Sequence, residues 1–90
     1  MRIEKSLPIV NKLGLHARAA TQLVQLANQF SSTITLQQDD KQANANSVLA
    51  LMMLESSQGK QVTLCCEGDD AEQAFTAIEQ LITNKFNESE

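Results

Sequence analysis

Hydrophobic and polar residues alternate at the start of the chain, and the spacing then changes to that of a helix. The apolar side chains of residues 3–10 fall on one face with a period of two, which predicts a β-strand. Pro8 lies within this segment and has no backbone N–H, so we expect the strand at an edge of a sheet. From Ala17 to Phe30 the apolar residues recur at helical spacing, which predicts an amphipathic helix.

The middle of the chain predicts a hairpin followed by a second helix. Residues 33–38 alternate and are rich in β-branched side chains, which favour a strand. Asp39-Asp40 suits a tight turn, and residues 41–45 then form a short return strand. Residues 48–54 are apolar throughout, and their Leu, Met and Ala favour a helix. Ser47 precedes this run and suits its N-cap.

The last third of the chain predicts one more strand and one more helix. Residues 62–67 alternate again, which indicates a strand. A helix follows Gly68, and Asp69 with Glu72 form a start signal that resembles a capping box. The apolar stripe of this helix comprises Ala71, Ala74, Phe75, Ile78, Leu81, Ile82 and Phe86.

The predicted order of elements is strand, helix, strand, strand, helix, strand, helix. This order indicates an α+β fold in which a four-stranded antiparallel sheet carries three helices on one face, an open-faced sandwich. Ninety residues suffice for one modest core, so we expect a single domain over residues 1–90 without a deep pocket.

Charge and composition narrow the classes of partner. The chain has seven Lys and Arg and eleven Asp and Glu. The resulting net charge of −4 disfavours binding to nucleic acid and to anionic membrane surfaces. Three Phe, without Tyr or Trp, leave little to stack on bases. No apolar run is long enough to span a membrane, and the first residues do not resemble a signal peptide. We expect a cytoplasmic monomer.

The two cysteines, Cys65 and Cys66, are adjacent and are expected to be ordinary strand residues. Neighbours on a strand point to opposite faces, so these two cannot easily form a disulfide. Two cysteines and one histidine make no zinc-ligand pattern. The chain also contains no Gly-rich nucleotide loop, so we expect neither a metal nor a cofactor.

His16 is the only histidine and the most informative residue of the chain. It lies where the loop that contains Gly14 meets the predicted helix. If His16 is the N-cap, the amides of Ala17, Arg18 and Ala19 have no helical acceptor. These amides and the positive end of the helix dipole together form an anion site.

A phosphoryl group on the ring of His16 would lie over these amides, with Arg18 in reach to neutralise it. We expect a ring nitrogen to be free to attack phosphorus, and the sharp turn that Gly14 permits to leave the imidazole exposed. The alternative interpretation is a surface histidine at a helix start beside a solvated arginine. Histidine is not a favoured N-cap residue, however, so its position there needs another reason.

The segment Gly14-Leu15-His16-Ala17-Arg18 resembles the active-site motif of HPr, the histidine-containing phosphocarrier family of the phosphoenolpyruvate phosphotransferase system. The resemblance covers residues 2–86. The region of the second helix, residues 44–54, is most similar to the nitrogen-related branch of the family, NPr.

This resemblance implies an open-faced βαββαβα sandwich and a carrier that is not a stand-alone enzyme. Phosphorylated enzyme I would supply a phosphoryl group to Nδ1 of His16, an enzyme IIA would receive it, and Arg18 would contact it. The family usually has proline after the arginine, where this chain has Ala19. Alanine loosens the helix start but adds a donor, so we expect an altered phosphohistidine lifetime and an unchanged role.

The apolar run of residues 48–54 is a candidate docking surface. A helix that is apolar on every side cannot bury all of them against one sheet, so some should be exposed, and methionine suits adaptable contacts. The alternative is a helix that is simply buried. The expected partner-binding residues are Ala20, Val48, Leu49, Met52 and Met53. Sugar-pathway relatives often carry lysines on this face, whereas Gln25, Asn28 and Ala50 are uncharged here, which weakens attraction to acidic partners.

Ser47 has two interpretations. It matches a serine that a dedicated kinase phosphorylates in some Gram-positive relatives, and phosphate there would place negative charge in the docking face. The simpler interpretation is an N-cap hydroxyl. The remaining acidic clusters are interpreted as a turn at Asp39-Asp40, a helix start at Asp69-Asp70 and a frayed tail at Glu88-Ser89-Glu90.

The leading hypothesis is therefore a phosphocarrier of the nitrogen-related phosphotransferase system. A sugar-pathway carrier is one alternative. A second is a binding regulator on the same fold that acts without being phosphorylated. A third is a small ligand-sensing domain, although the apolar positions look fully used by one core.

Overall fold

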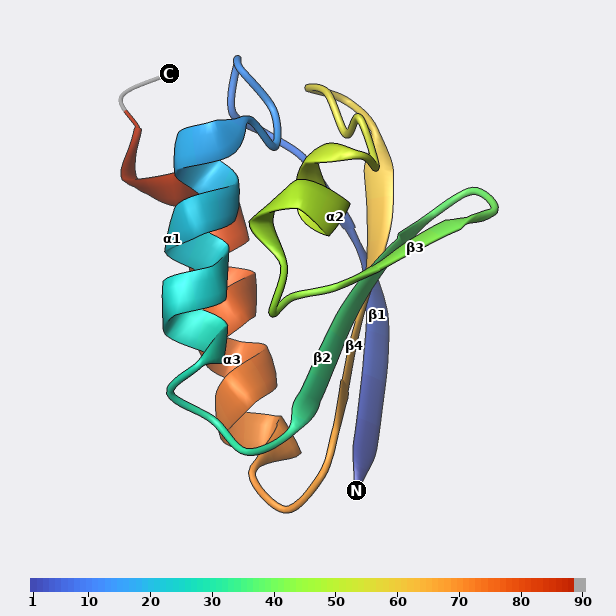
Figure 1. Ribbon diagram of the computed structural model, residues 1–90, viewed down its shortest axis with the longest axis vertical. Coiled ribbons are helices and arrows are strands. Elements are labelled where there is room, and N and C mark those ends of the chain that lie inside the picture. Colours follow the sequence, from blue (N-terminus) through green and yellow to red (C-terminus); the bar gives the residue numbers. More distant parts are fainter. Residues whose placement is uncertain (89–90) are drawn as a thin grey trace.

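The computed structural model describes residues 1–88, and the predicted open-faced fold is confirmed there. Within this part of the chain four strands pair antiparallel in the order β1-β4-β2-β3. The helices cover one face of the sheet and leave the other open (Figure 1). The elements are β1 (Arg2–Pro8), α1 (Ala17–Ala27), β2 (Thr33–Gln38), β3 (Lys41–Asn44), α2 (Val48–Met52), β4 (Gln61–Glu67), α3 (Ala71–Thr83) and a 3₁₀ turn, η1 (Lys85–Asn87).

The strand that contains proline lies at the edge of the sheet, as predicted. β1 pairs with β4, from Arg2 opposite Glu67 to Pro8 opposite Gln61, and its other side has no neighbouring strand in the described sheet. An edge strand tolerates Pro8 because one of its sides needs no backbone donor.

Alternate residues of β2 and β4 build the floor of the core. Leu36 lies opposite Leu64, and both are fully buried beneath the helices. Cys66 is buried on the same face, whereas Cys65 is half-buried on the open face and pairs with Thr35. The two cysteines are free and point to opposite faces, as predicted. From the helices the core receives Leu23, Leu51, Phe75, Ile78 and Ile82.

The predictions for the first two helices both extend too far. α1 ends at Ala27, not at Phe30. α2 ends at Met52, not at Leu54. Leu54 is nevertheless fully buried and Phe30 half-buried, so the apolar pattern continues after the backbone has left the helix. Hydrophobic spacing reports burial, and it therefore misses the residue at which helical hydrogen bonding stops.

The predicted capping box at the start of α3 is wrong. The N-cap is Asp70, and its carboxylate makes no capping bond to α3. It accepts hydrogen bonds from the Ser31 N–H (2.8 Å), the Ser32 N–H (2.9 Å) and the Ser32 hydroxyl. These bonds hold the pKa of the Asp70 carboxyl below its usual value, with the Ser32 hydroxyl as the largest cause. The acid ties the loop after α1 to α3.

Phe86 belongs to η1, not to the last helix as the stripe suggested. Lys85, Phe86 and Asn87 all have positive φ, at 59°, 53° and 64°. This left-handed turn changes the direction of the chain, and the Phe86 ring is fully buried although its backbone is outside α3. Left-handed backbone is costly for residues other than glycine, and a buried aromatic ring is the kind of contact that can offset it.

No helix among residues 1–88 is both long enough and apolar enough to cross a membrane.

Candidate functional site

The loop before α1 is held by backbone contacts that only glycine permits. Gly14 has a φ of +67°, and a Cβ atom there would collide with the Ser56 carbonyl oxygen and lie 2.9 Å from the Ser57 Cα. The next residue, Leu15, donates its N–H to the same Ser56 oxygen (2.8 Å). This close approach fixes the direction in which the chain enters α1.

His16 caps α1, as predicted. Its backbone is extended, and its C=O accepts the first helical hydrogen bond from the Ala20 N–H (2.8 Å). Its side chain accepts a bond at Nδ1 from the Ala19 N–H (3.2 Å). The Ala17 and Arg18 amides precede the first helical bond and therefore have no acceptor within the helix. The nitrogen Nδ1 thus lies at the positive end of α1.

The other ring nitrogen of His16 contacts an acid from the far end of the chain. Nε2 lies 2.6 Å from Glu88 Oε2. The second carboxylate oxygen of Glu88 accepts a bond from Asn11 Nδ2 (2.8 Å), and the same amide also donates to the Gly14 C=O (2.8 Å). Asn11 is fully buried. The site therefore joins the loop, the helix start and the end of η1.

Two expectations about this site are wrong. The imidazole of His16 is not exposed, because its side chain is only 26% exposed and both of its ring nitrogens have partners within the protein. Glu88 was interpreted as part of a frayed tail, yet its side chain is 14% exposed and bonded at both oxygens. Ser89 and Glu90, the rest of that expected tail, lie outside the described residues.

Sequence reasoning missed Asn11 and Glu88 for different reasons. Asn11 offered a signal, because asparagine at the start of a loop often hydrogen-bonds nearby backbone, as it does here with Gly14. Glu88 offered none, since its partners are far away in the sequence and it reaches them only through the left-handed turn of η1.

Arg18 lies on the exposed side of the first turn of α1. It lines a hollow of about 490 Å³ with Lys12, Leu13, Gln22 and the turn residues 86–88. Within residues 1–88 the guanidinium makes no hydrogen bond or ion pair. It is therefore available to an anion that binds at the start of the helix.

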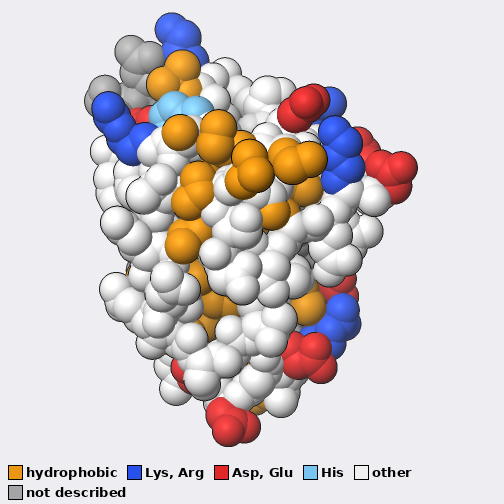
Figure 2. All heavy atoms as spheres, in the orientation of Figure 1, with side chains coloured by type: hydrophobic (Ala, Val, Ile, Leu, Met, Phe, Trp, Pro, Cys, Tyr) orange, Lys and Arg blue, Asp and Glu red, His pale blue; other side chains and the backbone are white. Residues whose placement is uncertain are grey.

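An exposed apolar surface, formed by Leu13, Leu49, Met52 and Met53, lies at the same end of the molecule. Leu49 is 69% and Met53 65% exposed, and Val48 beside them is half-buried. Figure 2 shows apolar side chains beginning beside the histidine and continuing across this face. The prediction that α2 exposes part of its apolar surface is confirmed.

One residue of the expected docking set is excluded. Ala20 is fully buried, because it faces the core one turn into α1, so it cannot contact a partner on this surface. Leu13 takes its place in the exposed set. The sequence did offer a signal for Leu13. It is an apolar residue in a loop, between Lys12 and Gly14, and it belongs to no predicted strand or helix.

Ser47 is the N-cap of α2, as predicted. Its hydroxyl accepts a hydrogen bond from the Ala50 N–H (3.1 Å), and the residue is half-buried. This bond accounts for a serine at the position without any modification.

Metal ligation finds no support among the described residues, where no three His, Cys, Asp or Glu side chains group together. The two cysteines are free, and Cys66 is buried. Burial, with smaller contributions from Cys65 and Asp70, raises the pKa of the Cys66 thiol to about 11. That thiol stays protonated at neutral pH.

Comparisons with known proteins agree with one another. A family model described as "PTS HPr component phosphorylation site" matches residues 3–84. The phosphocarrier protein NPr of Shewanella violacea is 50% identical over 98% of this chain and 97% of its own, and NPr of Escherichia coli is 38% identical over 98% and 99%. A crystal structure of HPr from Thermoanaerobacter tengcongensis superposes with a TM-score of 0.92 at 46% identity, over 98% of this chain and 99% of its own.

Proposed function

Since the chain belongs to the HPr family of phosphocarrier proteins of the phosphotransferase system, we propose that Nδ1 of His16 is its phosphoryl acceptor. The donor is a phosphorylated protein of the enzyme I type, and the acceptor is a protein of the enzyme IIA type. The observation that carries the proposal is the placement of Nδ1 at the N-terminus of α1, 3.2 Å from the Ala19 N–H.

The chemistry needs only one nucleophile from this chain. The Nδ1 lone pair attacks phosphorus, a P–N bond forms, the donor's bond to phosphorus breaks, and the donor's leaving group takes the electron pair. Onward transfer reverses these roles. The incoming phosphoryl group displaces the Ala19 N–H from Nδ1, and this N–H then donates to a phosphoryl oxygen.

Charge at the start of α1 supports the phosphorylated state. The amides of Ala17, Arg18 and Ala19 point toward the group, and the positive helix end attracts it. Arg18 is exposed beside them and can reach a phosphoryl oxygen. A carrier needs this stabilisation to be moderate, because excessive stabilisation would stop the onward transfer.

Docking is assigned to the apolar surface of Leu13, Leu49, Met52 and Met53, together with the half-buried Val48. Its large exposed side chains lie beside the histidine, so a partner that covers them also excludes water from the reacting group. The same contact therefore limits hydrolysis during the transfer.

We assign the protein to the nitrogen-related branch. Three observations support this assignment: the similarity of the α2 region to the nitrogen-related branch, the absence of charge at Gln25, Asn28 and Ala50, and the 50% identity to one NPr. Overall identity to this chain separates the two branches poorly, because an HPr of known structure is 46% identical to it and a second NPr only 38% identical.

We also propose that the protein is a monomer, which light scattering would check.

The first experiment incubates the purified protein with phosphoenolpyruvate and each of two enzyme I paralogues, one from each branch, and follows intact mass. The expected result is a gain of one phosphate, lost in acid and absent in His16→Ala, with faster uptake from the nitrogen-type donor. Faster uptake from the sugar-type donor would reverse the assignment of branch.

Two other results would point elsewhere. A protein that takes no phosphate from either donor is not a carrier for them. If His16→Ala still exerts every effect on a partner IIA, the chain acts as a binding regulator on this fold.

A further inference from the structure

We propose that Glu88 is a positioning residue for phosphoryl transfer: its carboxylate holds the Nε2 proton of His16 and stabilises the positive charge that the ring acquires when Nδ1 is phosphorylated. The proposal rests on the proposed function of His16. It assigns a role to the end of the chain that neither the motif nor the helix start supplies.

Two independent contacts specify the same tautomer of the neutral ring. Nδ1 faces the Ala19 N–H, which can only donate, so Nδ1 must present its lone pair. Nε2 faces a carboxylate oxygen at 2.6 Å, which can only accept, so Nε2 must carry the hydrogen. The nucleophilic lone pair therefore lies on the nitrogen at the helix start.

Formation of the P–N bond changes the charge of this ring. Nδ1 contributes its lone pair to phosphorus while Nε2 keeps its hydrogen, so the ring becomes a cation unless that proton leaves. The Glu88 carboxylate already lies against Nε2, with its side chain only 14% exposed. A fixed anion at the nitrogen that gains positive charge stabilises the transition state without reorganisation.

The carboxylate is held from two sides. Asn11 uses both hydrogens of its amide, one for Glu88 Oε1 and one for the Gly14 C=O, at 2.8 Å each. The left-handed turn of η1 brings Glu88 back toward α1, and Asn87 Nδ2 fastens this turn to Gln22 Oε1 (3.1 Å). The Glu88 N–H also donates to the Lys85 C=O (2.9 Å).

Glu88→Gln is the sharpest test, because it keeps an acceptor for Nε2–H and removes the charge. Phosphoramidate serves as a small phosphoryl donor, so that docking of a protein partner plays no part. We expect the rate of phosphorylation to fall about tenfold, the difference between a charge-assisted and a neutral hydrogen bond. With an enzyme I donor, kcat should fall by a similar factor while KM changes little, since Glu88 is outside the apolar surface.

NMR tests the contact itself without any phosphate. In the wild type the Nε2 proton of His16 should be observable and shifted downfield by the short bond to the carboxylate. In Glu88→Gln it should move upfield, and in Glu88→Ala it should be lost to exchange with water. The matched control is Glu72→Gln, which removes an exposed carboxylate at the other end of α3 and should change neither the proton nor the rate.

The outcomes separate the two proposals. If wild type takes no phosphate from any donor, the function of His16 fails, and the charge role of Glu88 fails with it, whatever the NMR shows. If wild type is phosphorylated and Glu88→Gln reacts at the same rate, only the role of Glu88 is overturned. A Nε2 proton that is unchanged in Glu88→Ala would overturn the contact.

Discussion

Single atoms of His16 decide what the ring can do. Its backbone C=O starts the hydrogen bonding of α1, its Nδ1 accepts from that helix, and its Nε2 contacts Glu88. Serine or aspartate would cap the helix as well, but neither presents a nitrogen lone pair at the anion-binding end. Under the proposed function, the need for that lone pair explains an otherwise unfavoured N-cap residue.

Gly14→Ala should disrupt the entry into α1. The new Cβ would meet backbone atoms of Ser56 and Ser57, at a φ of +67° that alanine tolerates poorly. We expect the free energy of unfolding to fall by at least about 2 kcal/mol, measured by urea denaturation, and phosphorylation of His16 to slow.

The matched control is Gly59→Ala. Gly59 also has a positive φ, of +91°, but no atom lies within 4 Å of the added Cβ. It should cost only the backbone strain, about 1 kcal/mol. Equal losses in the two variants would show that the contact of Gly14 with residues 56–57 contributes nothing.

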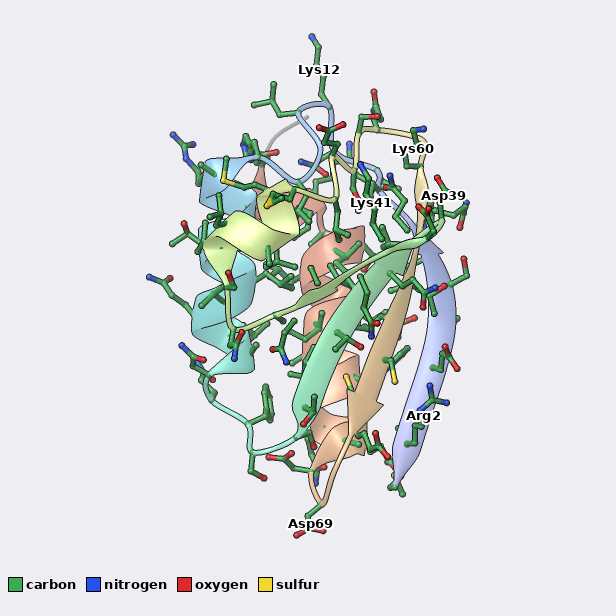
Figure 3. All side chains as sticks on the ribbon, turned by 45° about the vertical axis from the view of Figure 1, so that its right-hand side comes forward. Arg2, Lys12, Asp39, Lys41, Lys60 and Asp69 are labelled. Atoms are coloured by element: carbon green, nitrogen blue, oxygen red, sulfur yellow. The ribbon has the colours of Figure 1, made fainter. Side chains whose placement is uncertain are left out.

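At the scale of elements, the two long helices are joined at both ends by side chains. Asp70 ties the start of α3 to the loop that follows α1. At the other end, η1 returns from α3 to α1 and carries Asn87 and Glu88 to their partners. In Figure 3, Asp69 and Lys12 mark these two opposite ends. The junction at Asp70 stabilises the fold, and the junction at η1 places Glu88 beside His16.

Asp70→Asn should make stability less sensitive to acid. The folded pKa of this carboxyl is lowered, so its contribution is complete above the ordinary value of 3.8 and is lost as the pH falls through the lower, folded value. The wild type should therefore exceed the variant in stability at pH 7, and this difference should shrink toward zero in strong acid. Urea denaturation across the pH range measures it.

Asp69→Asn serves as the control, because Asp69 is exposed and takes no part in the hydrogen bonds of this junction. It should leave the acid profile of the wild type unchanged. A constant difference between wild type and Asp70→Asn at every pH would contradict the assignment of this acid sensitivity to Asp70.

At the scale of the whole molecule, a buried core fills the body, and an exposed apolar surface lies at the end that carries His16 (Figure 2). The helices bury one face of the sheet, and the core they share reaches from Leu7 to Phe86. Among the described residues, Met1 is the one large exposed apolar side chain that lies outside the apolar surface next to His16. An exposed apolar surface of this kind, beside a polar site, is typical of an interface.

Leu49→Asp should weaken docking and leave the fold intact. A charge in the middle of an apolar contact should lower kcat/KM for phosphate uptake from an enzyme I about tenfold or more. Because Leu49 is 69% exposed, the free energy of unfolding should change by no more than about 0.5 kcal/mol. Phosphorylation by phosphoramidate should stay at the wild-type rate.

Thr76→Asp provides the comparison, since Thr76 is exposed on α3 and outside the apolar surface. It adds the same charge and should leave uptake unaffected. If both variants lose activity equally, net charge and not the apolar surface governs the encounter.

The sequence by itself determined the features that depend on neighbouring residues. Alternation, helical spacing and residue propensity predicted the four strands and the three α-helices, though not η1. Capping chemistry placed Ser47 at a helix start, and the change of spacing placed His16 at another. The proline of β1 predicted its edge position. These features are local, because the hydrogen bonds and side-chain directions that produce them involve only a few consecutive residues.

Only the tertiary structure decided which distant groups meet. Glu88 reaches His16 because η1 is left-handed at three residues, none of which is a glycine that would have predicted it. The buried Phe86 holds this turn in place. Asp70 leaves its own helix for the serines after α1, and Ala20 turns inward where a partner contact was expected. Each outcome follows from how the elements pack. Contacts between residues that are far apart in the sequence produce no periodic pattern from which they could be predicted.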